Sequence, residues 1–453
     1  WLLAALFLLN EEQAVPHSEL LYVLQHGSEK QKKFLRRILG KEKDWEKALT
    51  ALVDEWEYPA GEILRLLPPR PQPSISDPEP KIDFFHQRWV AFLWQNLPEK
   101  DLKALQEFFT RSYPGLEQAF EWFRENYSLN WDQIFVRFRV EDKRPSKVKL
   151  TSLDLTSLPE WVKQMKYLQE LNVSSNQISR LPDWLCTLKE LRGLELRINQ
   201  LIALPESIGN LTKLEGLWLY NNQLQSLPKS FCKLTNLQIL DIGGNQLEQL
   251  PDSFNQLVNL KELYLWGNQL QSLPESFGDI LNLQTVNLGG NQLSFLPNSF
   301  GQLTNLQVLH FWNNRLCSLP ETFGWLKNLQ TLGLEANELH SLPKNFGQLT
   351  SLQTLNLSWN QLGSLPRTFE NLKHLKELDL NSNQLSSLPE FINNLINLVT
   401  LDLSNNMLTS LPKTIGDLKN LKRLHLGNNP LSDSKEEREK LIRLLPDCII
   451  EWT

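Results

Sequence analysis

An asparagine that recurs every 23 residues is the feature that most constrains how this chain can fold. A proline follows six residues after each of the first eleven asparagines, from Pro182 to Pro412. A short unit copied this often cannot bury its apolar side alone, so neighbouring units must stack on one another. The recurring residues are Asn176, Asn199, Asn222, Asn245, Asn268, Asn291, Asn314, Asn337, Asn360, Asn383, Asn406 and Asn429.

The unit has the pattern LxxLxLxxNxLxxLPxxFxxLxx, and each part predicts a local structure. Leu240 and Ile242 alternate with polar or small residues, which is the period of a short strand with one buried face. The asparagine amide can both donate and accept, so we expect it to bond backbone groups of its own and adjacent turns. The proline fixes φ and turns the chain. The phenylalanine that follows, such as Phe254, is expected to begin a short helical turn.

This motif resembles the leucine-rich repeat family, in particular its 23-residue class with a Leu-Pro step, as in plant intracellular Ras-group and bacterial repeat proteins. The resemblance covers residues 147–431, about twelve full repeats after a degenerate first turn in which Leu153 replaces the asparagine. It implies an α/β solenoid with a parallel sheet on the concave side and short helices on the convex side. Twelve strands at about 4.8 Å would form a face roughly 58 Å long.

The residues that follow the repeats predict a C-terminal cap over 432–453. Ser434 and Glu437 form a Ser-x-x-Glu capping box that should begin a helix, and a final edge strand should come after it. Such a cap shields the apolar end of a stack of repeats.

The residues before the repeats show helical spacing and no 23-residue unit, which predicts an all-α region. We divide it into a helical module (1–67), a proline-rich linker (68–81) and a second helical module (82–146) that leads into the N-terminal cap. The chain begins with Trp1 rather than Met, so we expect that sequence upstream is missing.

Composition excludes several classes of function. The net charge of −6 is spread evenly, without the basic domain that generic nucleic-acid binding requires. No apolar run reaches the roughly 18 residues that suggest a membrane span. The cysteines show no zinc-ligand spacing, and we expect them to be reduced, as in the cytoplasm, or in a host cytosol if the chain is a bacterial effector. They are Cys186, Cys232, Cys317 and Cys448.

The chain carries no Walker P-loop, GxSxG, HExxH or GxGxxG motif. We therefore predict a non-enzymatic adaptor or sensor, with no catalytic residue, metal or cofactor. Two alternatives stay open. One is an effector with catalysis in the N-terminal helical region and the repeats as its targeting module, and the other is a carbohydrate-binding surface.

The concave face of the expected solenoid carries aromatic residues every second repeat. Residues that lie six, four, two and one before each asparagine should point out of the sheet. The repeats between them carry glycines such as Gly243 and Gly289, which predicts troughs between aromatic ridges. A 46-residue duplication would copy such residues without selection, but exposed aromatic patches usually mark interaction sites. The ridge residues are Trp218, Tyr220, Tyr264, Trp266, His310, Trp312 and Trp359.

The same face has nine acidic and three basic residues. These acidic residues are explained equally well if they only keep an exposed sheet solvated. If they act in recognition, the partner is a protein or peptide that is basic or bears aromatic or proline residues, and phosphates would be repelled. We assign Asp241, Glu262, Glu335 and Asp379 to partner binding beside the aromatic residues. Oligomeric state is left open.

Overall fold

The computed structural model describes residues 116–127, 137–141 and 144–452. These residues fall into two compact units. The first includes the described residues up to Leu150 together with Pro159–Leu171, and the second comprises Thr151–Leu158 and the residues from Asn172 onward. The predicted modules and linker before residue 116 lie outside the described residues.

The described part of the first unit contains one helix and a β-hairpin. Helix α8 (Leu116–Tyr127) is present where the spacing predicts a helix. Strands β1 (Phe138–Glu141) and β2 (Arg144–Lys149) pair antiparallel, and the 3-10 turn η1 (Glu160–Gln164) follows. The all-α expectation for the residues up to 146 therefore does not hold where β1 and the start of β2 lie. In β2 buried Val148 alternates with half-buried lysines, a period of two that favours a strand.

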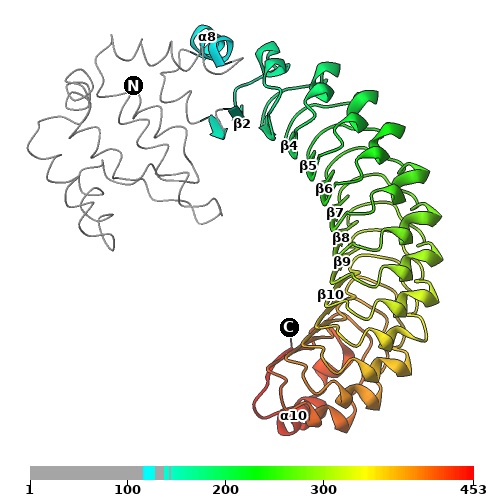
Figure 1. Cartoon of the computed structure of the whole chain (residues 1–453). Coiled ribbons are helices and arrows are strands. Elements are labelled where there is room, and N and C mark those ends of the chain that lie inside the picture. The colour runs from blue at the N-terminus through cyan, green and yellow to red at the C-terminus, as the bar shows by residue number, and fades with distance from the viewer. Residues whose placement is uncertain (1–115, 128–136, 142–143, 453) are drawn as a thin grey trace, which may run out of the picture. The chain divides into compact units, whose positions relative to one another are not determined.

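The second unit is a coil of short parallel strands that lie side by side in chain order from β4 to β15 (Figure 1). From β4 to β14 neighbouring strands keep a register of 23 residues, so Leu217 lies opposite Leu240, whereas β15 pairs with β14 at an offset of 26 residues. The strands line one side of the coil, and the connecting turns form the other (Figure 1). From β3 onward the strands are β3 (Glu170–Asn172), β4 (Gly193–Glu195), β5 (Gly216–Trp218), β6 (Ile239–Asp241), β7 (Glu262–Tyr264), β8 (Thr285–Asn287), β9 (Val308–His310), β10 (Thr331–Gly333), β11 (Thr354–Asn356), β12 (Glu377–Asp379), β13 (Thr400–Asp402), β14 (Arg423–His425) and β15 (Ile449–Glu451).

The convex elements are single 3-10 turns, tighter than the short helices that the sequence suggested. All except η9 and η13 begin directly after the proline of a Leu-Pro step; the carbonyl of Pro297, for example, accepts from Phe300 N–H at 3.0 Å. A proline here loses no bond, because its missing N–H would be unpaired at this position. The turns are η2 (Asp183–Thr187), η3 (Glu206–Asn210), η4 (Lys229–Lys233), η5 (Asp252–Gln256), η6 (Glu275–Asp279), η7 (Asn298–Gln302), η8 (Glu321–Trp325), η9 (Phe346–Gln348), η10 (Arg367–Asn371), η11 (Glu390–Asn394), η12 (Lys413–Asp417) and η13 (Pro430–Asp433).

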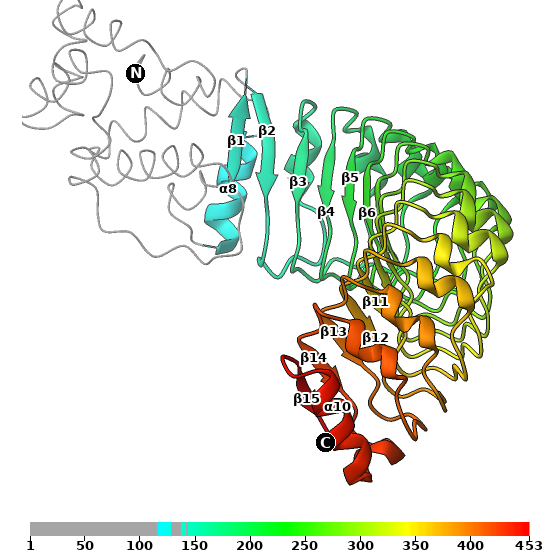
Figure 2. The ribbon, with the colours of Figure 1, turned by 90° about the horizontal axis from the view of Figure 1, so that it is seen from below.

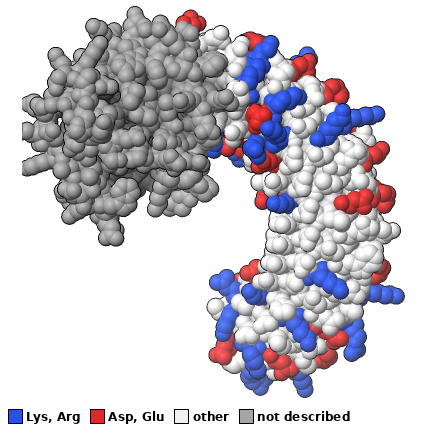
Figure 3. All heavy atoms as spheres, viewed as in Figure 1, with Lys and Arg blue, Asp and Glu red and all other residues white. Residues whose placement is uncertain are grey.

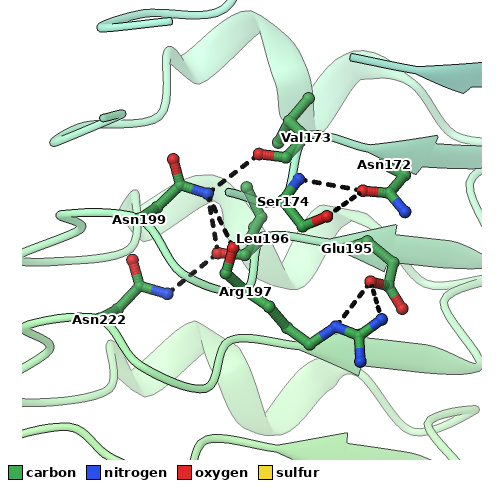
Figure 4. Close-up of polar contacts among 8 residues, drawn as sticks. All are labelled: Asn172, Val173, Ser174, Glu195, Leu196, Arg197, Asn199 and Asn222. Atoms are coloured by element: carbon green, nitrogen blue, oxygen red, sulfur yellow. Dashed lines mark hydrogen bonds and ion pairs between the residues drawn. The ribbon is translucent and has the colours of Figure 1, made fainter. Parts of the chain in front are cut away.

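Two side-chain stacks hold the coil together. The phenylalanines of the turns are fully buried, and from Phe254 to Phe369 successive rings stack nearly parallel, 5.8 to 6.5 Å apart. The repeating asparagines form a buried ladder, as predicted. The Asn199 amide nitrogen donates to the carbonyls of Val173 and Leu196, and its oxygen accepts from Ile178 N–H (the donor contacts are drawn in Figure 4).

The C-terminal end of the coil is covered by helix α10 (Lys435–Leu444) and strand β15 (Figure 2). The Ser434 hydroxyl accepts from Glu437 N–H at 3.3 Å, so the predicted capping residue does begin the helix. Leu441 of the helix is buried, which shields the last repeat. Within the described ranges, no helix has both the length and the apolar character needed to cross a bilayer.

Candidate aromatic binding surface

Three aromatic residues occupy the position two before the ladder asparagine in alternate repeats: Tyr220, Trp266 and Trp312. We call them the aromatic strip. Each follows a strand on the strand side of the coil, and each is partly exposed. The rings of Tyr220 and Trp266 have centroids 6.3 Å apart although a whole repeat separates them. The strip therefore begins as a continuous aromatic surface.

The glycines between the strip residues are covered by the indoles rather than open as troughs. A Cβ added to Gly243 would come within 2.3 Å of the Trp266 ring, and one added to Gly289 would come within 2.1 Å of the Trp312 ring. Each indole leans back over the preceding repeat, which only a residue without a side chain permits. The expected alternation of ridges and troughs is thus replaced by flat rings lying over glycine.

A second row lies four before the ladder asparagine, at Trp218, Tyr264 and His310, and these side chains are also half-exposed. The Trp218 indole covers Gly216 of its own strand. The Tyr264 hydroxyl donates to a carboxylate oxygen of Glu262 at 3.0 Å. Burial, this hydrogen bond and the negative charge of Glu262 raise the pKa of Tyr264 to about 12. Tyr264 therefore remains a neutral donor at physiological pH.

The N-terminal end of the strip is bounded by an ion pair. Arg197 Nε donates to Glu195 at 2.8 Å (Figure 4), and the Arg197 guanidinium lies 5.4 Å from the centre of the Tyr220 ring. Burial raises the pKa of Asp241, partly opposed by a hydrogen bond from Gly243 N–H and by the charge of Arg197. The predicted site residue Asp241 therefore lies in the same electrostatic environment as the strip.

The C-terminal end of the strip carries a partly buried carboxylate. Glu335 Oε2 is shielded from solvent and has no hydrogen-bond partner within the described ranges. Burial raises the pKa of Asp379, and the charges of Asp402 and Glu335 contribute to the increase. The predicted acidic residues therefore lie in two groups, Asp241 with Glu262 near the first rings and Glu335 with Asp379 beyond the last.

We expect Asp379→Asn to increase stability at pH 7. Because the native state raises the pKa of Asp379, folding favours the protonated form, and its contribution to stability falls as pH rises above the unfolded value. Asparagine keeps the acceptor for Asn381 N–H, as Asn356 does in the preceding strand. Urea unfolding at pH 7 and pH 3 should show a difference from wild type only at pH 7. Asp252→Asn, on an exposed turn, is the charge-matched control; equal gains from both would contradict the argument.

Trp359 is separate from the strip. It lies one before its ladder asparagine, its side chain is 66% exposed, and its φ is +56°. The residues at this position in all the described repeats are left-handed, and several are asparagine or glycine, which tolerate that conformation. The predicted ridge of seven residues thus divides into the two rows and this isolated indole.

Replacing Trp359 by asparagine should raise the free energy of unfolding by up to about 1 kcal/mol, because a bulky side chain is strained at positive φ. The backbone bonds at this position, from Trp359 N–H to Asn381 and from Asn337 N–H to the Trp359 carbonyl, do not depend on the side chain. The midpoint of urea unfolding measures the effect. A loss of stability would show that the exposed indole makes contacts that outweigh its strain.

Charge is low around the middle of the strip. Between Tyr264 and Asn314 the chain has no Lys or Arg, and its acidic residues there are Glu275 and Asp279. Both belong to turn η6 on the convex side. Figure 3 shows the corresponding pattern on the visible side of the coil, where charged side chains gather toward the two ends. Trp266 and Trp312 therefore lie in a largely neutral stretch with acidic groups on either side.

Family models match the chain over most of this coil. A model described as "Leucine-rich repeat region" matches residues 366–441, and models described as leucine-rich repeats match 167–188, 212–256, 258–316 and 304–362. The chain belongs to the leucine-rich repeat family. This confirms the resemblance stated from the motif, and the parallel sheet confirms the solenoid fold. The curated proteins contain no match to this leucine-rich repeat chain.

Solved structures similar to this leucine-rich repeat chain come from bacteria and animals. A leucine-rich repeat protein of Leptospira interrogans is 33% identical, over 68% of this chain and 95% of that one, with a TM-score of 0.49. An internalin of Listeria monocytogenes is 21% identical, over 76% and 96%, with a TM-score of 0.60. A chain of the Drosophila Toll–Spatzle complex is 31% identical, over 61% and 38%, with a TM-score of 0.52.

The described ranges contain no group of three or more His, Cys, Asp or Glu residues placed to hold a metal ion. The cysteines Cys186, Cys232, Cys317 and Cys448 are all free, and burial raises the pKa of the first two. The site is thus built from aromatic rings, glycines and carboxylates, a composition suited to binding a ligand by packing and hydrogen bonds.

Proposed function

We propose that this chain is a non-enzymatic adaptor or sensor whose concave face binds a protein partner through the aromatic strip. The observation that carries the proposal is the row of partly exposed rings at Tyr220, Trp266 and Trp312, of which the two indoles lie over glycines. Aromatic residues dominate binding hot spots, because they supply a large contact area at low entropic cost. Burying two indoles and a phenol against a partner would contribute several kcal/mol.

The comparisons support this class of function. Internalins and the Toll–Spatzle chain share the repeat architecture, and the latter belongs to a complex between proteins. The carboxylates of Asp241, Glu262 and Glu335 flank the strip, which favours a partner with basic groups. The free thiols support a reducing compartment such as the cytoplasm, which we propose as the location. Catalysis in the N-terminal helical region (1–146) and a carbohydrate-binding surface stay alternative predictions.

Affinity capture with a matched pair of variants tests this function. We expect wild type to retain a partner from lysate that Trp266→Ala/Trp312→Ala loses, with binding at least about tenfold weaker. Trp325→Ala is the control, because its indole is 49% exposed on convex turn η8. A partner that is lost with the Trp325 variant and kept by the strip variant would move the site to the convex side and refute the proposal.

A further inference from the structure

The residue two positions before each ladder asparagine has a backbone N–H that makes no hydrogen bond to a neighbouring strand. In many repeats a side chain accepts a hydrogen bond from this N–H. The acceptor is an asparagine or aspartate four before the ladder asparagine, at 2.8 to 3.1 Å. This side chain lies on the concave face, so the N–H is directed to that face. The acceptors are Asn172, Asp241, Asn287, Asn356, Asp379 and Asp402.

In the strip repeats this acceptor is missing, because Trp218, Tyr264 and His310 occupy its position. The N–H groups of the three strip residues have no hydrogen-bond partner in the part of the chain that the structure describes. Arg197, Glu335 and Gly427 also lack an Asn or Asp at that position, but none of them is aromatic. The strip thus combines a flat ring with an unused backbone donor at every second repeat.

The spacing of these donors selects the conformation of a ligand that runs along the strip. Two repeats correspond to about 10 Å at the usual strand spacing. One turn of polyproline II, three residues at 3.1 Å, advances about 9 Å and leaves every carbonyl free to accept. An α-helix also repeats near this distance, over two turns, but its carbonyls are already bonded within the helix. A β-strand repeats at about 7 Å and does not match.

The carboxylates beside the strip indicate which side chains lie between the prolines of the ligand. Trp266 and Trp312 lie in the stretch without Lys or Arg, whereas the Tyr220 ring contacts Arg197, which is paired with Glu195. Asp241 and Glu262 flank the first rings, and Glu335 follows the last. Glu335 Oε2 is buried and has no hydrogen-bond partner among the described residues, so no donor there offsets the negative charge of this carboxylate. A basic residue in each turn of the ligand would lie near these carboxylates while the proline packs on a ring.

We propose that the aromatic strip binds a proline-rich segment of a partner protein in the polyproline II conformation, with proline at every third position and basic residues between. Its carbonyls accept from the N–H groups of Tyr220, Trp266 and Trp312, and its prolines pack on their rings. This inference rests on the proposed function and specifies the chemistry of the partner.

Calorimetric titration of the full chain with the peptide (Pro-Pro-Arg)₄ tests the ligand class. We expect saturable binding, and binding at least about tenfold weaker for (Gly-Gly-Arg)₄, which has the same charge without the conformation, and for (Pro-Pro-Glu)₄. Equal binding of the Gly and Pro peptides would overturn the inference, since charge alone would then explain affinity. Tighter binding of chitohexaose than of (Pro-Pro-Arg)₄ would also overturn it and assign the strip to glycans.

Two sets of variants test the geometry. Gly243→Ala/Gly289→Ala keeps all rings but displaces both indoles, and should weaken (Pro-Pro-Arg)₄ about tenfold. Gly363→Ala, with open space around the added Cβ, should have no effect. His310→Asn supplies the acceptor that Asn287 provides for Gly289, so it should bind at least about fivefold more weakly than His310→Ala. Equal affinity of the two His310 variants would refute the role of the backbone donor.

The outcome separates this inference from the function on which it rests. If no proline peptide binds but a captured partner is still lost with Trp266→Ala/Trp312→Ala, the strip is a protein site for a different kind of segment and this inference fails alone. If capture is also unchanged, both fail. Circular dichroism of each variant confirms that it is folded before binding is compared.

Discussion

Replacing Phe300 by alanine should lower the free energy of unfolding by about 3–5 kcal/mol, the range for a fully buried phenylalanine. The side chain is inaccessible to solvent, and its ring lies 5.8 Å from Phe277, 6.2 Å from Phe323 and 5.5 Å from Phe311. Loss of the ring leaves a cavity between Phe277 and Phe323 of the adjacent turns and Phe311, which follows strand β9. The gap therefore cannot close without shifting neighbouring repeats.

Denaturant unfolding measures this effect, with Phe295→Ala as the control within the same repeat. Phe295 is 53% exposed, so its loss should change stability by less than about 1 kcal/mol. In a solenoid each repeat contacts only its neighbours, so the loss can appear as early local unfolding. Faster hydrogen exchange of the amides in β8 and β9 would then report this local unfolding. Equal effects of the two variants would show that the phenylalanine stack is not the core of the coil.

Asn291→Ala is expected to cost about 3 kcal/mol, because it leaves several buried backbone groups unpaired. The Asn291 side chain accepts from Leu270 N–H at 3.0 Å and donates to the carbonyls of Leu265 and Leu288 at 3.0 and 2.9 Å. Each of these groups belongs to a different part of the stack, and an alanine reaches none of them. Water cannot replace the amide, because the residue is 7% exposed.

Asn305→Ala is the matched control for the ladder. Its amide donates one bond, to the Leu281 carbonyl at 2.8 Å, at an exposed position. We expect a loss of at most about 1 kcal/mol, because water can replace this donor. If Asn305→Ala were as destabilising as Asn291→Ala, the need to hydrogen-bond buried backbone groups would not explain why the ladder asparagine recurs every 23 residues in this chain.

The control belongs to a second asparagine series that the sequence analysis missed. These residues lie on the convex connections and each donates to the carbonyl 24 residues earlier: Asn236, Asn259, Asn282, Asn305, Asn328, Asn397 and Asn420. The same 23-residue period in the sequence could have revealed them. Their partners could also have been predicted, because repeats stack in register and each side chain lies beside the preceding repeat.

The features that could be predicted from the sequence were those that the 23-residue repeat determines. The buried ladder, the strand face and the Ser434 cap follow from residue types at fixed intervals. The orientation of the Trp266 and Trp312 rings did not follow, because it depends on the glycine of a neighbouring repeat. The unpaired donors of the strip also escaped prediction. Side-chain patterns do not show which backbone groups the stacking of coils leaves without a partner.

The most direct test of the central claim is photo-crosslinking from the strip itself. A photoreactive phenylalanine analogue at Tyr220 keeps the size of the ring, and the same analogue at Trp325 on η8 serves as the convex control. After irradiation of the full chain in lysate, mass spectrometry identifies what is attached. We predict a protein adduct at position 220, mapped to one segment of the partner, and none of that partner at 325. Adducts of the same protein at 325 and none at 220 would contradict a binding site on the concave face.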